Sequence, residues 1–231
     1  MTTRIYLIRH GETQLSAEDR FSGGTDVELS DTGRWQATCL ARRLADDGIS
    51  AFYCSPMKRT IETATIISAS YGMIPDTREG LREIYHGHWE TMDRRDVQTQ
   101  FPEEYAAWQE DPFTFAPEDG ESGVMVMARA LPAIREIVVN HAGQRVVVVS
   151  HKATIRLILS SLLGFDARGY RDRLDQSPAC LNILDFRDAV RARLMLFNDV
   201  SHYVDQPPYS AKRLSEWFDT NAKERSEEQD I

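Results

Sequence analysis

Basic and polar side chains follow three apolar runs of strand length. They are Arg9 and His10 after Ile5–Ile8, Ser55 to Arg59 after Ile49–Cys54, and Ser150 with His151 after Val146–Val149. In open α/β sheets the ligand binds outside the carboxyl ends of the strands, so we expect these residues to meet in one crevice. Arginine stays charged and its planar fork matches phosphate oxygens. The sequence therefore predicts a site for a tetrahedral anion.

An imidazole in such a site could accept a phosphoryl group. We expect His10 to be the nucleophile, because nearby guanidinium groups favour its neutral ring, and a phosphohistidine divides one difficult step into two. The leaving alkoxide then needs a proton. Glu83, in Leu81-Arg82-Glu83, is the candidate acid, a role that typically contributes roughly 10²–10⁴-fold. The same carboxylate could later activate the hydrolytic water.

The elements that must position these residues alternate between strands and helices. Helices are predicted from Ser30 to Gly48, over Met57–Tyr71, over about Val124–His141 and over Ala153–Leu163. Two later runs, Leu181–Phe186 and Ala192–Phe197, are typical of strands nearer a sheet edge. This order predicts an α/β fold in three α/β/α layers, with a mostly parallel open sheet flanked by helices.

Residues 1–204 are predicted to form one catalytic domain. Within it, residues 93–121 are acidic, aromatic and interrupted by prolines, which indicates a helical or loop excursion that caps the site. Its carboxylates predict that a highly anionic ligand is disfavoured there. Residues 205–231 form a polar C-terminal extension, with one short amphipathic piece around Leu214, Trp217 and Phe218 that we expect to dock on the body.

The composition limits the partners. The 231 residues carry 27 Lys and Arg against 36 Asp and Glu, a net charge of −9, which disfavours nucleic acid and anionic membranes. Three widely spaced cysteines argue against a disulfide framework and a structural zinc site. We expect a cytoplasmic monomer or homodimer whose partner is a small phosphorylated substrate.

The ordered motifs resemble those of the histidine phosphatase superfamily, which includes the phosphoglycerate mutases. They are Leu7 to Thr13, Phe21-x-Gly23, Ser55-Pro56-x-x-Arg59, Leu81-x-Glu83, Gly87-x-Trp89-Glu90, Gly120-Glu121-Ser122 and Val149-Ser150-His151. The resemblance implies a phosphoglycerate mutase-like fold, His10 as the phosphorylated residue, and Arg9, Arg59 and His151 as a phosphate clamp. It also implies Glu83 as proton donor, no cofactor and no metal.

Further positions are predicted to bind the substrate. They are Ser16, Ser22, Gly23, His86 and Lys152. Two of them depart from the family pattern, because Ser16 stands where relatives usually carry Asn and Lys152 where many carry Gly.

The segment after Glu83 separates the branches of the family. His86-Gly87-His88-Trp89-Glu90 is similar to the phosphatase pattern, whereas mutases hold a second phosphate with a Glu-Arg-Arg patch. Arg94-Arg95 is a badly placed substitute for that arginine pair. A phosphatase is favoured; a 2,3-bisphosphoglycerate-dependent phosphoglycerate mutase and a non-catalytic phospho-ligand-binding relative stay open.

Two other kinds of site are less favoured. Cys54 and Arg59 have four residues between them and no glycine, so they cannot form the phosphate loop of a cysteine phosphatase, and Cys54 is expected to be a small buried side chain. His86 and His88 could share a face and chelate a metal, but no third ligand is apparent, so a polar loop beside the site is the preferred interpretation.

Overall fold

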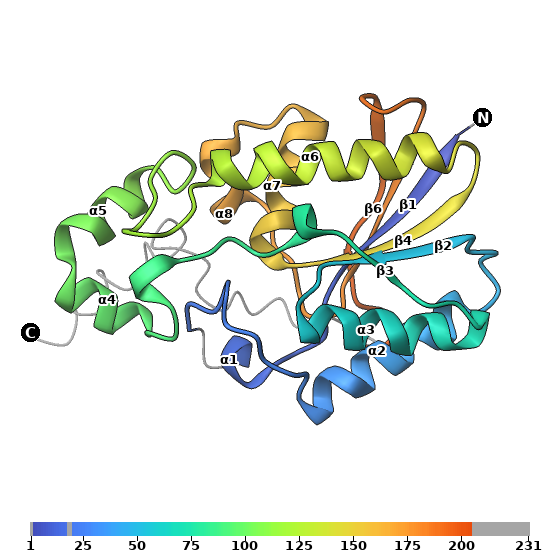
Figure 1. The fold of residues 1–231 in the computed structure, drawn as a ribbon, viewed down its shortest axis with the longest axis horizontal. Helices are drawn as coiled ribbons and strands as arrows, with labels where there is room; N and C mark the ends of the chain where they lie inside the picture. The colour runs from blue at the N-terminus through green and yellow to red at the C-terminus, as the bar shows by residue number, and fades with distance from the viewer. Residues whose placement is uncertain (1, 18–19, 205–231) are drawn as a thin grey trace, which may run out of the picture.

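The computed structural model describes residues 2–17 and 20–204, and its centre is one six-stranded sheet (Figure 1). The strands are β1 (Thr3–Arg9), β2 (Ala51–Cys54), β3 (Asp76–Thr77), β4 (Arg145–Ser150), β5 (Leu181–Phe186) and β6 (Ala192–Asp199). Their order is β3-β2-β4-β1-β5-β6, with parallel pairing from β3 to β1 and antiparallel pairing of β5 with β1 and β6. The predicted mostly parallel sheet is confirmed.

Helices cover both faces of this sheet. They are α1 (Gln14–Ala17), α2 (Asp31–Leu44), α3 (Lys58–Ser68), α4 (Arg94–Gln100), α5 (Pro102–Glu110), α6 (Gly123–Asn140), α7 (Lys152–Leu163) and α8 (Tyr170–Arg173). In Figure 1, α6 and α7 lie on one face and α2 and α3 on the other. The predicted three-layer α/β/α architecture is thus confirmed.

The side-chain alternation of the central strands produces these layers. Ile5 and Leu7 of β1 belong to the core under α6 and α7, whereas Tyr6 and Ile8 belong to the core under α2 and α3. Residues Val146 to Val149 of β4 divide in the same way and are all fully buried. A continuous β-branched run is what a strand buried on both faces requires.

Local signals fix most helix ends. Ser30 caps α2, its side chain accepting a hydrogen bond from Gly33 N, and α7 stops at Gly164, whose φ is +74°. The predicted end of α2 at Gly48 is wrong, because regular helix stops at Leu44. Strand β2 begins at Ala51 rather than Ile49, and the short elements β3 and α8 were not predicted, since two and four residues show no periodicity.

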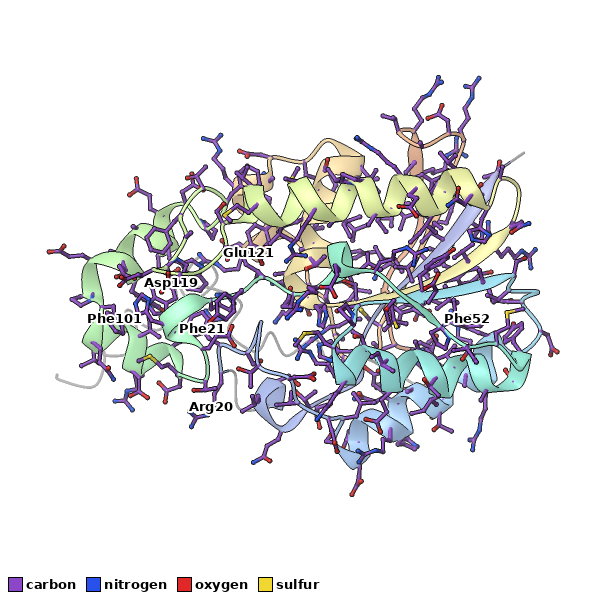
Figure 2. All side chains as sticks on the ribbon, in the orientation of Figure 1. Arg20, Phe21, Phe52, Phe101, Asp119 and Glu121 are labelled. Atoms are coloured by element: carbon purple, nitrogen blue, oxygen red, sulfur yellow. The ribbon has the colours of Figure 1, made fainter. Side chains whose placement is uncertain are left out.

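Helices α4 and α5 project beyond the carboxyl ends of the parallel strands (Figure 1). Their buried side chains Val97, Tyr105 and Trp108 form a small core of their own with Phe21 and Trp89. Figure 2 shows Phe21 and Phe101 at this end of the molecule, far from Phe52 in the body of the sheet. Phe21 therefore anchors the loop after β1 to the excursion, by ring contacts to Trp89 and Trp108 at 5.4 Å.

The boundary between a catalytic domain at 1–204 and an extension at 205–231 stays a prediction. The amphipathic piece around Leu214, Trp217 and Phe218 lies outside the described residues. Within the described residues, none of the helices combines the length and the apolar character needed to cross a bilayer.

Candidate active site

The carboxyl ends of three adjacent parallel strands bring the distant motifs together. Arg9, the last residue of β1, pairs with Ser150, the last residue of β4. The amide of His10 donates to Ser150 O at 3.0 Å, and the amide of Ser55, just after β2, donates to Val149 O at 3.0 Å. The three chain segments therefore leave the sheet side by side, as the sequence predicts.

The ring of His10 is held in one neutral form. Its Nδ1 lies 2.7 Å from Gly11 O, and because a carbonyl only accepts, Nδ1 carries the hydrogen. Burial, with the nearby charges of Arg59 and Arg9, lowers the pKa of His10 well below 6.5. At neutral pH the ring thus has a lone pair on Nε2, as a nucleophile needs.

His151 stands behind His10 rather than in the open part of the site. The two rings pack edge to face with centroids 5.2 Å apart. Nδ1 of His151 accepts from Arg59 Nε at 3.2 Å, and Nε2 lies 2.8 Å from Ser55 Oγ. Burial and the Arg59 charge lower the pKa of His151 well below 6.5, so a neutral ring orients Arg59 in this arrangement.

Arg59 lies in the first turn of α3 and is almost fully buried. Its Nη1 donates to Thr25 O at 2.8 Å, while Nη2 donates to Gly23 O at 2.9 Å and to Ser22 O at 3.3 Å. Burial lowers the pKa of Arg59, partly offset by Glu83 and other carboxylates. The guanidinium thus ties the loop of residues 22–25 to the start of α3.

Gly23 has a steric reason to be glycine. A Cβ built at this position would lie 1.6 Å from Ile84 O and 2.7 Å from Ile84 C, a clash with backbone. The loop 22–25 therefore packs directly against the segment that carries Glu83. A side chain here would separate the carbonyls that hold Arg59 from the proposed acid.

Glu90 fixes the same loop from the other side. Its Oε1 accepts from the amides of Gly24 and His86 at 3.0 Å, and its Oε2 accepts from the Thr25 amide at 3.1 Å and hydroxyl at 2.7 Å. Burial alone would raise the pKa of Glu90, but these hydrogen bonds bring it below its ordinary value. The ionised carboxylate therefore supports the carbonyls that bind Arg59.

Glu83 sits over the N-terminus of α7. Its Oε1 accepts from the amides of Ile84 at 3.0 Å and Thr154 at 3.1 Å, and its Oε2 accepts from the Ala153 amide at 3.1 Å. Two helix amides thus fix the carboxyl group beside the cavity. Oε1 also accepts from the Thr154 hydroxyl at 3.0 Å, so Oε2 has the fewer donors.

Arg129 of α6 holds the segment on which Glu83 lies. It donates to Arg82 O at 2.7 Å and Glu83 O at 2.9 Å, and forms a bidentate pair with Glu121, whose two bonds are both 2.8 Å. The sequence marked Glu121 in a motif but gave it no role, and Arg129 was missed. Glu121 lies just before α6 and Arg129 lies eight residues later within it, so this pair leaves no recognisable spacing in the sequence.

One cavity of about 140 Å³ opens at this end of the sheet. Every predicted site residue except His151 lines it, including Lys152 at the first position of α7 and His86, whose pKa burial lowers. Ser16 also lines it, but its hydroxyl accepts from Thr13 N at 2.9 Å and donates to Thr13 O at 2.9 Å. The Ser16 hydroxyl therefore stabilises the turn that leads into α1.

Several lining residues were not among the predicted site residues. They are the arginines Arg20, Arg94, Arg156 and Arg171 and the aromatic residues Phe21, Trp108 and Tyr170. Among the described residues that line the cavity, Glu83 is the only carboxylate. Arg156 had a signal in the sequence, because it is a charge in an otherwise apolar run four residues after Lys152.

The expectation that the excursion disfavours anionic ligands stays a prediction, but none of its described carboxylates lines the cavity. From this segment only Arg94 and Trp108 line the cavity among the described residues. Arg94 rests on the ring of Trp108 at 5.4 Å, whereas Glu103 and Glu110 are exposed and Glu104 pairs with His88. The acidic composition of residues 93–121 did not predict the charge of the cavity wall, because the described carboxylates of this segment do not line the cavity.

Comparison with known proteins gives one consistent family. Residues 5–200 match the model of the histidine phosphatase superfamily (branch 1). Phosphoserine phosphatase 1 of Hydrogenobacter thermophilus is 34% identical over 163 residues, 71% of this chain and 77% of its own. Phosphoglycerate mutase-like protein 4 of Arabidopsis thaliana is 34% identical over 201 residues, 86% of each chain.

Solved structures agree in fold. Bacillus stearothermophilus YhfR is 30% identical with a TM-score of 0.80, covering 87% of this chain and 98% of that one. A mycobacterial glucosyl-3-phosphoglycerate phosphatase in complex with VO3 is 29% identical with a TM-score of 0.77, covering 84% of this chain and 98% of that one.

Proposed function

Because the chain belongs to the histidine phosphatase superfamily, we propose that it hydrolyses a small phosphate monoester through a phosphohistidine on His10. Phosphatase relatives support hydrolysis of phosphate monoesters. The observation that carries the finer proposal is the Nδ1 hydrogen bond from His10 to Gly11 O, since it leaves a lone pair on Nε2 in a ring that lines the cavity.

In the first step Nε2 of His10 forms a bond to phosphorus while the bond to the ester oxygen breaks. Arg9 and Arg59 supply positive charge to the phosphoryl oxygens. Protonated Oε2 of Glu83 gives its proton to the departing alkoxide, so the products are an alcohol, a phosphohistidine and a carboxylate.

In the second step the Glu83 carboxylate takes a proton from water. The water oxygen attacks phosphorus, the bond to Nε2 breaks, and inorganic phosphate leaves with His10 neutral again. Each step uses groups that this chain supplies, so we propose activity without a metal ion. Hydrolysis should therefore survive a chelator, and strict dependence on an added divalent ion would contradict this part.

Trapping the intermediate tests the proposal. A substrate with radiolabelled phosphate, mixed with enzyme and denatured within milliseconds, should leave label that is lost in acid and retained in alkali. Peptide mapping should place it on His10, and His10→Asn should abolish both label and hydrolysis. Full hydrolysis by His10→Asn would exclude the mechanism.

The role of Glu83 has a separate test. Glu83→Gln keeps an oxygen acceptor but cannot deliver a proton, so hydrolysis of alkyl phosphates should fall by roughly 10²–10⁴-fold. Phosphoenzyme formation from nitrophenyl phosphate, whose leaving group needs little protonation, should slow much less. Equal slowing of this step for both substrates would remove Glu83 from the acid role.

A mutase is the second candidate, because Arg94 lines the cavity and a bisphosphate would need such additional cations. Arg95, its neighbour, is exposed, so the arginine pair typical of mutases is not formed at the cavity. Release of inorganic phosphate distinguishes the two functions, since a mutase conserves total ester phosphate. Binding of phosphate esters without either reaction would instead support a non-catalytic relative.

A further inference from the structure

We propose that Arg156 and Arg171 form a subsite for a second anionic group of the substrate, so that the preferred ester carries a carboxylate or another phosphate besides the one removed. The inference rests on the proposed phosphatase function and specifies the substrate class. Neither residue belongs to the groups assigned above to nucleophile, phosphate clamp or acid.

Arg156 is a buried cation with almost no protein partner. Its exposed fraction is 4%, yet its one hydrogen bond to the described residues is a long one of 3.4 Å from Nη2 to Asp175 Oδ1. Its buried Nε has no partner among them. Burying an unpaired charge costs free energy. Because the Arg156 side chain lines the cavity, an anion bound there would reduce this cost.

The position of Arg156 fits a second group on a small substrate. Arg156 lies four residues after Lys152, the first residue of α7. Its Cα is therefore about 6 Å along the helix axis from the N-terminus whose amides bind Glu83. Burial lowers the pKa of Arg156 to about 10, partly offset by Asp175, so it remains charged at neutral pH. His10 and Arg156 line the same cavity of about 140 Å³, so a substrate of a few carbons could contact both.

Arg171 of α8 completes the subsite. It is 6% exposed, and its guanidinium lies over the ring of Trp108 with its carbon 4.3 Å from the ring centroid. Its bonds to Trp108 O and Gln109 O are long, at 3.4 and 3.3 Å, and Nε donates to Asp172 at 3.2 Å. These bonds use three of the five N–H donors of the guanidinium, and the contact with the ring uses none, so two donors remain for a ligand.

The geometry favours an anion over a neutral polar group. Four arginines and Lys152 line the cavity in addition to Arg9 and Arg59, with Glu83 the only carboxylate among the described lining residues. A bidentate carboxylate or phosphate matches a guanidinium fork, whereas a hydroxyl or an ammonium does not. Carboxylate and phosphate share this chemistry, and the test must distinguish them.

The test compares ester pairs that differ in one anionic group. O-phosphoserine and O-phosphoethanolamine differ by a carboxylate; propane-1,3-diol bisphosphate and 3-hydroxypropyl phosphate differ by a phosphate. We expect the wild type to have kcat/KM about tenfold or more higher for the doubly anionic member of one pair, and that pair identifies the group. Arg156→Gln and Arg171→Gln should each remove most of this preference.

A matched control and an opposite variant exclude a merely structural role. Arg168→Gln removes an exposed arginine paired with Asp166 just before α8 and should keep the preference. Asp175→Asn weakens the only ion pair of Arg156 among the described residues and should strengthen the preference. If Arg156 only stabilises the fold, both Arg156→Gln and Asp175→Asn lower the melting temperature while the preference is unchanged, and the proposal is wrong.

Failure of the subsite and failure of the function give different results. Hydrolysis of nitrophenyl phosphate without preference in either pair overturns the subsite and leaves the phosphatase. If no ester is hydrolysed, calorimetry decides: tighter binding of O-phosphoserine or the bisphosphate than of its partner, lost in Arg156→Gln, supports the subsite, and equal binding overturns it. If Arg156→Gln does not fold, Arg171→Gln serves in the same measurements.

Discussion

The two ends of the cavity are built in different ways. The nucleophile end, formed by Arg9, His10, Arg59, Glu83 and His151, is held by several protein hydrogen bonds of 2.6–3.2 Å. The distal wall, formed by Arg94, Trp108, Arg156, Tyr170 and Arg171, has arginine bonds of 3.2–3.4 Å and ring contacts instead.

Under the proposed function, this difference separates the groups that carry out the reaction from those that select the substrate. A transition state is stabilised best by groups that need no reorganisation, and the hydrogen bonds of His10, Arg59 and Glu83 hold these groups in place at the nucleophile end. Arg94 and Arg171 rest on Trp108, and Arg156 has one long bond to Asp175 among the described residues, so this wall can accept the variable part of a substrate. Changes at the nucleophile end should therefore affect every substrate, and changes at the distal wall should affect selectivity.

Among the variants that compare the two ends without removing the nucleophile or the acid, the largest effect is expected for Arg59→Lys. A lysine keeps the charge but cannot bind Thr25 O, Gly23 O and His151 together, so both the loop 22–25 and the phosphoryl contact are lost. We expect kcat/KM for nitrophenyl phosphate to fall by roughly 10²–10³-fold.

Lys58→Gln is the control for Arg59→Lys, since this exposed neighbour lies in the same turn of α3 and does not line the cavity. Its kcat/KM for nitrophenyl phosphate should equal that of the wild type. A loss of less than about threefold in Arg59→Lys would mean that the charge alone matters, and the comparison between the two ends would lose its basis.

Gly23→Ala should have the next largest effect. The added Cβ would clash with the Ile84 backbone, so the loop 22–25 must move away from both Arg59 and Glu83. We expect about a 10–100-fold loss in kcat/KM, with a loss of roughly 1–3 kcal/mol in the free energy of unfolding.

The control for Gly23→Ala is Gly164→Ala at the end of α7. Its φ is +74°, but a Cβ there meets nothing within 4 Å. This change should cost stability through backbone strain and leave kcat/KM intact. Equal loss of activity in both variants would show that Gly23→Ala acts through general destabilisation.

Acidification provides a prediction for the buried histidines. Burial also lowers the pKa of His86 and His202, so the contribution of the nucleophile end is the part that its variants remove. The pKa values of His10 and His151 lie well below 6.5 in the folded protein, lowered by burial and by Arg59. Below pH 6.5 the unfolded imidazoles bind protons that the folded ones do not. The free energy of unfolding should therefore decrease as the pH is lowered, and the decrease approaches about 1.4 kcal/mol per pH unit for each ring only well below pH 6.5.

Urea unfolding at pH 7.5, 6.5 and 5.5 measures this slope. His10→Asn should reduce the total decrease between pH 7.5 and 5.5 by about 1.4 kcal/mol, because one of the buried rings is removed. The arginines of the distal wall do not titrate in this range and add nothing to the slope. Identical slopes in wild type and His10→Asn would mean that His10 is not held neutral.

The sequence was sufficient to predict which residues meet at the nucleophile end, because each of them lies in a short continuous motif. His10, Arg59 and His151 lie in short motifs directly after strands, and parallel neighbours place such ends together. The three-layer fold was predictable for the same reason, since a run such as Val146–Val149 allows few other environments.

The distal wall could not be predicted because it depends on how separate elements pack. Trp108, Arg156 and Arg171 come from α5, α7 and α8, and α8 is too short to be detected by periodicity. The composition of the excursion did not indicate the charge of the cavity wall, because its direction relative to the cavity follows from the aromatic core around Phe21 and Trp89. Side-chain direction in a short helix is fixed by tertiary contacts.

The smallest effect is expected for Trp108→Leu. This ring carries Arg171 at 4.3 Å and Arg94 at 5.4 Å, contacts worth about 0.5–2 kcal/mol each. Its loss should lower kcat/KM for doubly anionic esters about three- to tenfold more than for nitrophenyl phosphate. Trp35→Leu, a change at a half-exposed tryptophan on α2, is the control for loss of an indole. A uniform loss over all substrates would mean that Trp108 only holds the excursion together, and the distal wall would then have no part in selection beyond Arg156.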